Sequence, residues 1–197
     1  MQTSTLNNNP PPDGKSDSGF SLLEMVVAAT LLTIGLMAVA SALGYAMIAG
    51  NHGRAITNTK LLAVSMLEQM ETLRNSGQLT FGQIANVGQV NNLGATRAFG
   101  GFPPGPQQVS TEPGPDGIFG TADDLIDAGA DNQFGTSDDF TNPAFAVVSV
   151  TRQIQISSLS STLKKVQVTI NYPASGQMRQ LVAICYLNDN GTTTFVP

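Results

Sequence analysis

The sequence contains a single cysteine and a single histidine among 197 residues. One cysteine permits neither an internal disulfide framework nor a cysteine-based zinc site, and one histidine leaves few options for a histidine-dependent active site. Basic residues are also scarce: there are 9 lysines and arginines against 14 acids, without a cluster that could neutralise a row of phosphates. These shortages weigh against nucleic-acid binding. With 41% apolar residues the chain still has enough material for one modest core.

Residues 25–51 carry no side chain that is charged at neutral pH. At about 1.5 Å per residue, a helix of this length exceeds the roughly 30 Å hydrocarbon core of a bilayer. A buried core helix of that length would need far more surrounding protein than the rest of the chain supplies. The segment therefore predicts a membrane-spanning helix. The polar residues 1–18 before it do not have the order of a secretory signal.

One carboxylate interrupts the start of this apolar run. Glu24 follows the apolar residues that begin directly after Gly19. A charged side chain inside a membrane segment costs about 2.5–3.5 kcal/mol on insertion scales, and such residues are usually functional and paired. We therefore expect Glu24 to require a cationic partner.

Residues 19–24, Gly-Phe-Ser-Leu-Leu-Glu, resemble the class III signal of type IV prepilins and type II secretion pseudopilins. The resemblance implies that a prepilin peptidase cleaves after Gly19 and methylates the new N-terminal Phe20. It also implies that Glu24 pairs with the ammonium of Phe20, in its own or a neighbouring subunit. The implied location is the bacterial inner membrane, with the N-terminus cytoplasmic and a periplasmic head, and later a pilus or pseudopilus.

The helix is expected to continue beyond the membrane. Apolar residues recur at helical spacing between Ile56 and Leu73, which predicts an amphipathic half that runs to about Arg74. Asn75-Ser76-Gly77 then supplies a helix stop. Residues 63–74 also resemble the end of this helix in minor subunits of the PilV and GspI type.

A tandem acidic repeat follows in an otherwise irregular segment. Residues 116–124 recur fifteen positions later as residues 131–139, with six of nine positions identical. Each unit has three carboxylates brought together by a glycine turn, and calcium prefers oxygen ligands held in this way. No base lies in this segment to offset the repulsion between the acids. The calcium ligands expected from this pattern are Asp116, Asp123, Asp124, Asp131, Asp138 and Asp139.

Two other interpretations of the repeat stay open. The acids can serve the geometry of two solvated β-turns, or a carboxylate-based active site can use Asp123, Asp124, Asp138 or Asp139. In each unit the phenylalanine, Phe119 or Phe134, is expected to anchor the turn on the head.

The C-terminal part changes to a period of two. Runs at 144–156, 163–172 and 179–187, with a further candidate at 193–196, predict an antiparallel sheet that buries one face on the amphipathic half of the helix. Cys185 lies in the third run and is expected to be a small core residue.

Together these patterns predict an α+β protein in which a long N-terminal helix packs on a small antiparallel sheet. The expected division is a cleaved leader at 1–19, a transmembrane and polymerisation helix at 20–51, its amphipathic half at 52–76, an irregular loop at 77–143 and a sheet head at 144–197. The resemblance implies a non-enzymatic minor pilin or pseudopilin whose partners are a prepilin peptidase, other pilin subunits and the inner membrane. The alternative is a membrane-tethered calcium-binding or adhesive module that does not polymerise. Calcium is the cofactor expected.

Overall fold

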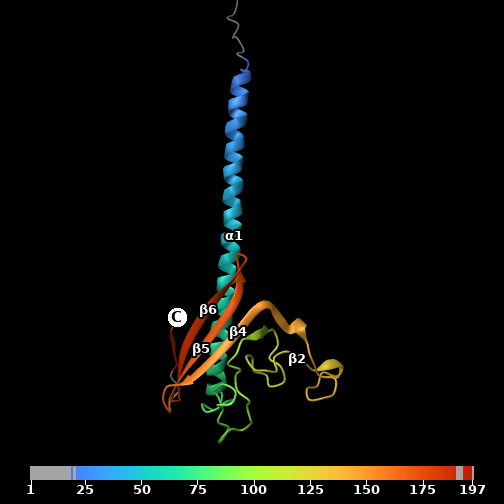
Figure 1. The fold of residues 1–197 in the computed structure, drawn as a ribbon, viewed down its shortest axis with the longest axis vertical. Coiled ribbons are helices and arrows are strands. Elements are labelled where there is room, and N and C mark those ends of the chain that lie inside the picture. Colours follow the sequence, from blue (N-terminus) through green and yellow to red (C-terminus); the bar gives the residue numbers. More distant parts are fainter. Residues whose placement is uncertain (1–18, 20, 190–192, 197) are drawn as a thin grey trace, which may run out of the picture. The chain divides into compact units, whose positions relative to one another are not determined.

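The computed structural model describes residues 19, 21–189 and 193–196 of the chain (Figure 1). The first element is the helix α1, Leu22–Asn75, which ends one residue from the boundary predicted. The strands are β1 Gln107–Ser110, β2 Ile126–Asp127, β3 Phe140–Thr141, β4 Ala146–Ser158, β5 Leu163–Ala174, β6 Gln177–Asn188 and β7 Thr193–Val196. The α+β prediction is confirmed. The chain divides into two compact units, Met1–Met47 and Ile48–Pro197.

The part of α1 in the first unit is apolar and exposed. Its serine and threonine hydroxyl groups donate to carbonyl oxygens one turn earlier: Thr30 to Val26 at 2.8 Å, Thr33 to Ala29 at 2.7 Å and Ser41 to Met37 at 2.9 Å. Because these polar groups are satisfied within the helix, none of them has to be left unpaired in lipid. In the described part of the chain, α1 is the one helix that is long and apolar enough to cross a membrane.

In the second unit, the C-terminal part of α1, from Ala63 to Leu73, supplies one side of the core. Met66, Leu67, Met70 and Leu73 are buried against the sheet, as the helical spacing predicts. The chain then leaves the helix at Gly77, whose φ of 71° requires the left-handed region that glycine adopts without strain.

The main sheet has the order β1-β4-β5-β6-β7, and all neighbouring strands are antiparallel (Figure 1). The fourth predicted strand, β7, is present. Val166, Val168 and Ile170 of β5 are completely buried and form the centre of the core with α1. Cys185 of β6 is also fully buried, and burial raises the pKa of its thiol to about 11. This cysteine is a core side chain with very little thiolate at neutral pH.

The connection between α1 and the sheet is held by buried polar side chains. Asn86 donates to the carbonyl oxygens of Phe102 and Ile154 at 2.9 and 2.8 Å. The Nζ of Lys164 donates to the carbonyl oxygens of Phe81 and Ile84 at 2.6 and 2.7 Å. The segment between α1 and β1 has no regular secondary structure and therefore no ladder of backbone hydrogen bonds. These side-chain hydrogen bonds take the place of that ladder and hold the segment on the sheet.

Three strands were not expected from the sequence, because β1, β2 and β3 all lie within residues 77–143, the segment predicted as irregular. β2 and β3 pair with each other, and β1 pairs with the outer edge of β4. A Gly- and Pro-rich stretch precedes β1 and masks the short alternation. Its position matters because β1 leads directly into the acidic repeat.

Candidate functional site

The residues of the proposed processing signal lie at the start of α1. Gly19 is exposed, and Glu24 is in the first turn of the helix, also exposed. No ion pair or hydrogen bond of the Glu24 carboxylate is present among residues 19, 21–189 and 193–196. Phe20, the predicted methylated residue, lies outside the described residues. A carboxylate in the first turn is favoured by the positive end of the helix dipole, but that position alone supplies no cation.

The acidic repeat forms two loops of the same design, longer than the nine residues that the sequence comparison detected. The first acidic loop comprises residues 114–124 and the second acidic loop comprises residues 129–139. Each begins with a glycine at a positive φ, 65° for Gly114 and 67° for Gly129. A Cβ at Gly114 would lie 2.2 Å from the carbonyl oxygen of Asp123, and one at Gly129 would lie 2.6 Å from that of Asp138. The two glycines therefore permit the same close approach of the backbone in both loops.

In the first acidic loop the carboxylates accept hydrogen bonds from the loop itself. The Oδ1 of Asp116 accepts from the N–H of Ile118 at 2.7 Å, and the Oδ2 of Asp123 accepts from the N–H of Asp116 at 3.2 Å. The hydroxyl of Thr121 lies 2.5 Å from the Oδ1 of Asp123 and 2.9 Å from the Oδ1 of Asp124. The acids thus hold the turn closed around one threonine.

The first loop also has a cation, supplied from outside the repeat. The Nη1 of Arg152 in β4 lies 2.8 Å from the Oδ2 of Asp124, and both side chains are almost completely buried. The Nη2 of Arg152 donates to the carbonyl oxygen of Thr121 at 3.1 Å. The carboxylate of Asp124 additionally accepts from the N–H of Gly120 at 3.0 Å. A charge-assisted pair with these further bonds offsets the cost of burying both ions.

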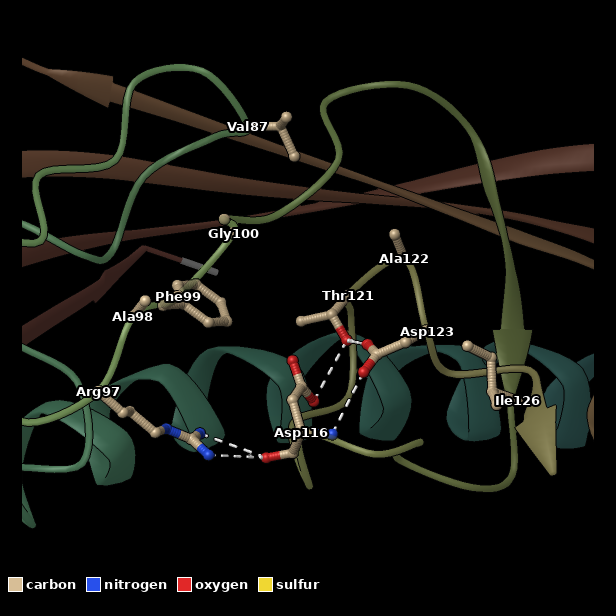
Figure 2. A pocket seen from close by; sticks show the side chains of 11 residues that line it. Val87, Arg97, Ala98, Phe99, Gly100, Asp116, Thr121, Ala122, Asp123 and Ile126 are labelled. Atoms are coloured by element: carbon tan, nitrogen blue, oxygen red, sulfur yellow. Dashed lines mark hydrogen bonds between the residues drawn. The ribbon is translucent and has the colours of Figure 1, made fainter. Parts of the chain in front are cut away.

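Asp116 lines an open cleft of about 590 Å³ beside the first loop (Figure 2). Figure 2 shows Arg97 reaching the backbone of Asp116, where both terminal nitrogens donate to the carbonyl oxygen at 3.2 Å. The pKa of the Asp116 carboxyl is raised to about 6, mainly by burial and secondarily by the negative charges of Asp123 and Asp124. The hydrogen bonds from Ile118 and Thr121 oppose this rise but do not cancel it.

The second acidic loop repeats most of these contacts. The Oδ1 of Asp131 accepts from the N–H of Gln133 at 2.9 Å, and the Oδ2 of Asp138 accepts from the N–H of Asp131 at 3.3 Å. The hydroxyl of Thr136 lies 2.6 Å from the Oδ1 of Asp138, and this bond is the main reason that the pKa of Asp138 is lowered. The short ribbon of β2 and β3 closes the base of the loop.

The two loops differ in their surroundings. Ile118 of the first loop is completely buried in the core, whereas its counterpart in the second loop, Gln133, is exposed. The prediction that Phe134 anchors its turn is wrong, because its side chain is 48% exposed. Phe119 is partly buried, and Ile118 is the residue that anchors the first loop.

The six predicted calcium ligands are brought together in two groups of three along the chain, but they do not form a metal centre in this geometry. No group of three or more His, Cys, Asp or Glu side chains in the described ranges is arranged to hold a metal ion. Asp124 has Arg152 as its counterion, and the acids also accept bonds from the backbone of their own loops. Calcium binding stays a prediction, and the argument that the acids lack a base applies only to the second loop.

Sequence reasoning missed Arg152 because it lies outside the acidic segment. The sequence did contain a signal for it. Arg152, Ile154 and Ile156 are spaced two residues apart, so their side chains lie on the same face of β4, the face toward the core. A buried guanidinium needs an anion, and the acidic segment is the part of the chain richest in them.

Residues 14–40 match the family model described as the prokaryotic N-terminal methylation motif. The matched range includes Gly19, Phe20 and Glu24 and is consistent with the class III signal of type IV prepilins and pseudopilins. The resemblance drawn from the sequence is confirmed at this level, whereas the PilV or GspI subtype stays a prediction. No curated protein and no solved structure matches the chain.

Proposed function

We propose that the chain is a minor subunit of a type IV pilus or of a type II secretion pseudopilus, and that it acts by assembly and not by catalysis. The observation that supports this most strongly is the continuity of one element. The methylation motif runs directly into a helix of 54 residues. The first half of this helix is apolar and exposed, and its last turns belong to the core of a folded unit.

The exposed half of α1 needs an apolar environment at every stage. Large side chains such as Leu31, Met37 and Leu43 are each more than 60% exposed. A contiguous apolar surface of this size is not stable in water, so it is covered first by lipid and then, after extraction, by the helices of other subunits. The same surface therefore serves as membrane anchor and as polymerisation interface.

Glu24 gives this assembly its register. The carboxylate is expensive inside a membrane and has no cation among the described residues. Cleavage after Gly19 creates an ammonium at Phe20, and a neighbouring subunit presents this group at the same depth. Pairing of the two charges favours one axial offset between adjacent helices. The precursor would span the inner membrane once, with its N-terminus cytoplasmic and the head periplasmic.

The direct test is the intact mass of the membrane-extracted protein after co-expression with a prepilin peptidase. We expect loss of residues 1–19 and addition of one methyl group to Phe20. Gly19→Val should block the cut, whereas Gly14→Val, which changes the other glycine of the leader, should leave it intact. An uncut wild-type chain, beside a control prepilin that is processed, would overturn the proposal and leave a membrane-tethered adhesive or calcium-binding module.

A further inference from the structure

We propose that the second acidic loop binds an arginine side chain of a partner protein, in the same way that the first acidic loop binds Arg152 of this chain. The first loop shows what this loop design recognises. Its carboxylate at Asp124 contacts Nη1 of Arg152 at 2.8 Å, and the adjacent carbonyl oxygen of Thr121 accepts from Nη2 at 3.1 Å. A planar guanidinium with several donors suits this pair of acceptors, whereas an ammonium has no such fork.

The second loop holds the equivalent carboxylate with two of the three donors found in the first loop. The N–H of Gly135 donates to the Oδ2 of Asp139 at 2.7 Å, as the N–H of Gly120 donates to the Oδ2 of Asp124 at 3.0 Å. The hydroxyl of Thr136 lies 3.4 Å from the Oδ1 of Asp139. The carboxylate is thus oriented before any partner arrives, which lowers the entropic cost of binding.

The second loop has no basic side chain of its own. In the described part of the chain, no lysine or arginine forms an ion pair or hydrogen bond with Asp131, Asp138 or Asp139. The loop lies at the surface, where Asp131 and Asp138 are exposed and Asp139 is partly exposed. The first acidic loop therefore has its arginine within the chain, whereas the second acidic loop presents the equivalent carboxylate to solvent.

The surroundings of the second loop suit a protein partner. Phe134 and Phe140 are 48% and 52% exposed beside the acids. Guanidinium groups stack on aromatic rings, and exposed aromatic residues next to charge are typical of protein interfaces. Charge complementarity and these rings together favour an arginine-bearing protein surface over a free metal ion.

The test uses the full-length protein in detergent micelles and follows its backbone amide resonances. N-acetyl-arginine methylamide is titrated as the probe, with N-acetyl-lysine methylamide as its matched comparison. We expect saturable shifts at Gly135 and Thr136, with binding about tenfold weaker for the lysine probe because its single nitrogen lacks the planar fork of spaced donors that a guanidinium offers. Asp139→Asn should weaken arginine binding by about tenfold or more, whereas Asp131→Asn, which removes the same charge at the position equivalent to Asp116, should weaken it far less.

Several results would overturn the proposal. These are the absence of a saturable shift, equal binding of the two probes, or equal weakening by the two variants, which would indicate charge attraction without a site. Saturable binding of calcium chloride with no preference for arginine over lysine would assign the loop to a metal ion instead. The preference of the wild-type protein for arginine decides the question even if Asp139→Asn alters its own loop. The measurement does not depend on processing or filament formation.

Discussion

Arg152 and Asp124 form a buried ion pair that joins the central sheet to the first acidic loop, with 2.8 Å between Nη1 and Oδ2. The same guanidinium donates to the carbonyl oxygen of Gln108 in β1 at 3.3 Å and to that of Thr121 in the loop at 3.1 Å. Burial lowers the pKa of Arg152, and the charge of Asp124 opposes that change. One side chain of β4 therefore fixes both the neighbouring strand and the turn that follows it.

Replacing this arginine should unfold the first acidic loop. We expect Arg152→Ala to lower the free energy of unfolding by about 3–5 kcal/mol, because it leaves the buried carboxylate of Asp124 without a partner. Thermal unfolding of the full-length protein in micelles, followed by near-ultraviolet circular dichroism, measures the loss. Arg179→Ala, at an exposed arginine of β6, should change stability by no more than about 0.5 kcal/mol.

The cavity left by Arg152→Ala also offers a chemical test of what the loop recognises. Methylguanidinium at millimolar concentration should restore part of the lost stability, and methylammonium should restore less, since only the former has the planar fork of donors that Arg152 supplied. A loss below about 1 kcal/mol in the variant would contradict a stabilising role of the buried pair.

Asp116 should make the stability of the head depend on pH. Its carboxyl has a pKa of about 6 in the folded protein against 3.8 for the ordinary group. The folded state therefore holds a proton that the unfolded chain has released, so stability falls as pH rises from about 4 to about 6 and is constant above that range. Asp116→Asn should remove this part of the slope. An identical pH profile in the wild type and the variant would contradict the raised pKa.

The two loop glycines should differ in the effect of the same substitution. Gly114→Ala places a Cβ 2.2 Å from the carbonyl oxygen of Asp123 in a buried loop, so we expect a loss of roughly 2 kcal/mol or more of global stability. Gly129→Ala creates the equivalent clash in the exposed loop. It should increase amide hydrogen exchange at Ala130 and Asp131, which donate to Asp138, with little effect on the melting temperature. Equal losses of global stability would show that the second loop is coupled to the core.

Glu24 should be needed for assembly but not for folding. Glu24→Gln removes the charge that the proposed pairing with Phe20 requires, so filament or pseudopilus yield should fall by about tenfold or more while the head keeps its melting temperature. Glu68→Gln, at an exposed acid of the same helix outside the motif, is the matched control. An unchanged yield of filaments in the Glu24 variant would contradict the pairing.

The sequence determined most of the architecture and both loop designs. The absence of charge over residues 25–51 and the helical spacing from Ile56 to Leu73 were sufficient for α1, and the period of two was sufficient for β4, β5 and β6. Both patterns are local, because they follow from the number of residues per helical turn and from the alternation of side chains along a strand. The buried Ile118 and the exposed Gln133 also distinguish the two acidic loops in the sequence, since only the former can contribute to a core.

Only the tertiary structure decided which charges meet. Arg152 reaches Asp124 because β4 pairs with β1 and the first acidic loop folds back over that edge, and no spacing along the chain encodes this contact. The short strand β1 was missed for the same reason, because its hydrogen bonds are made with a distant strand. Local composition predicted that both loops lacked a counterion, but the fold brought one to the first loop and left the second at the surface. Ionic contacts depend on distance in space, which the chain establishes only when it is folded.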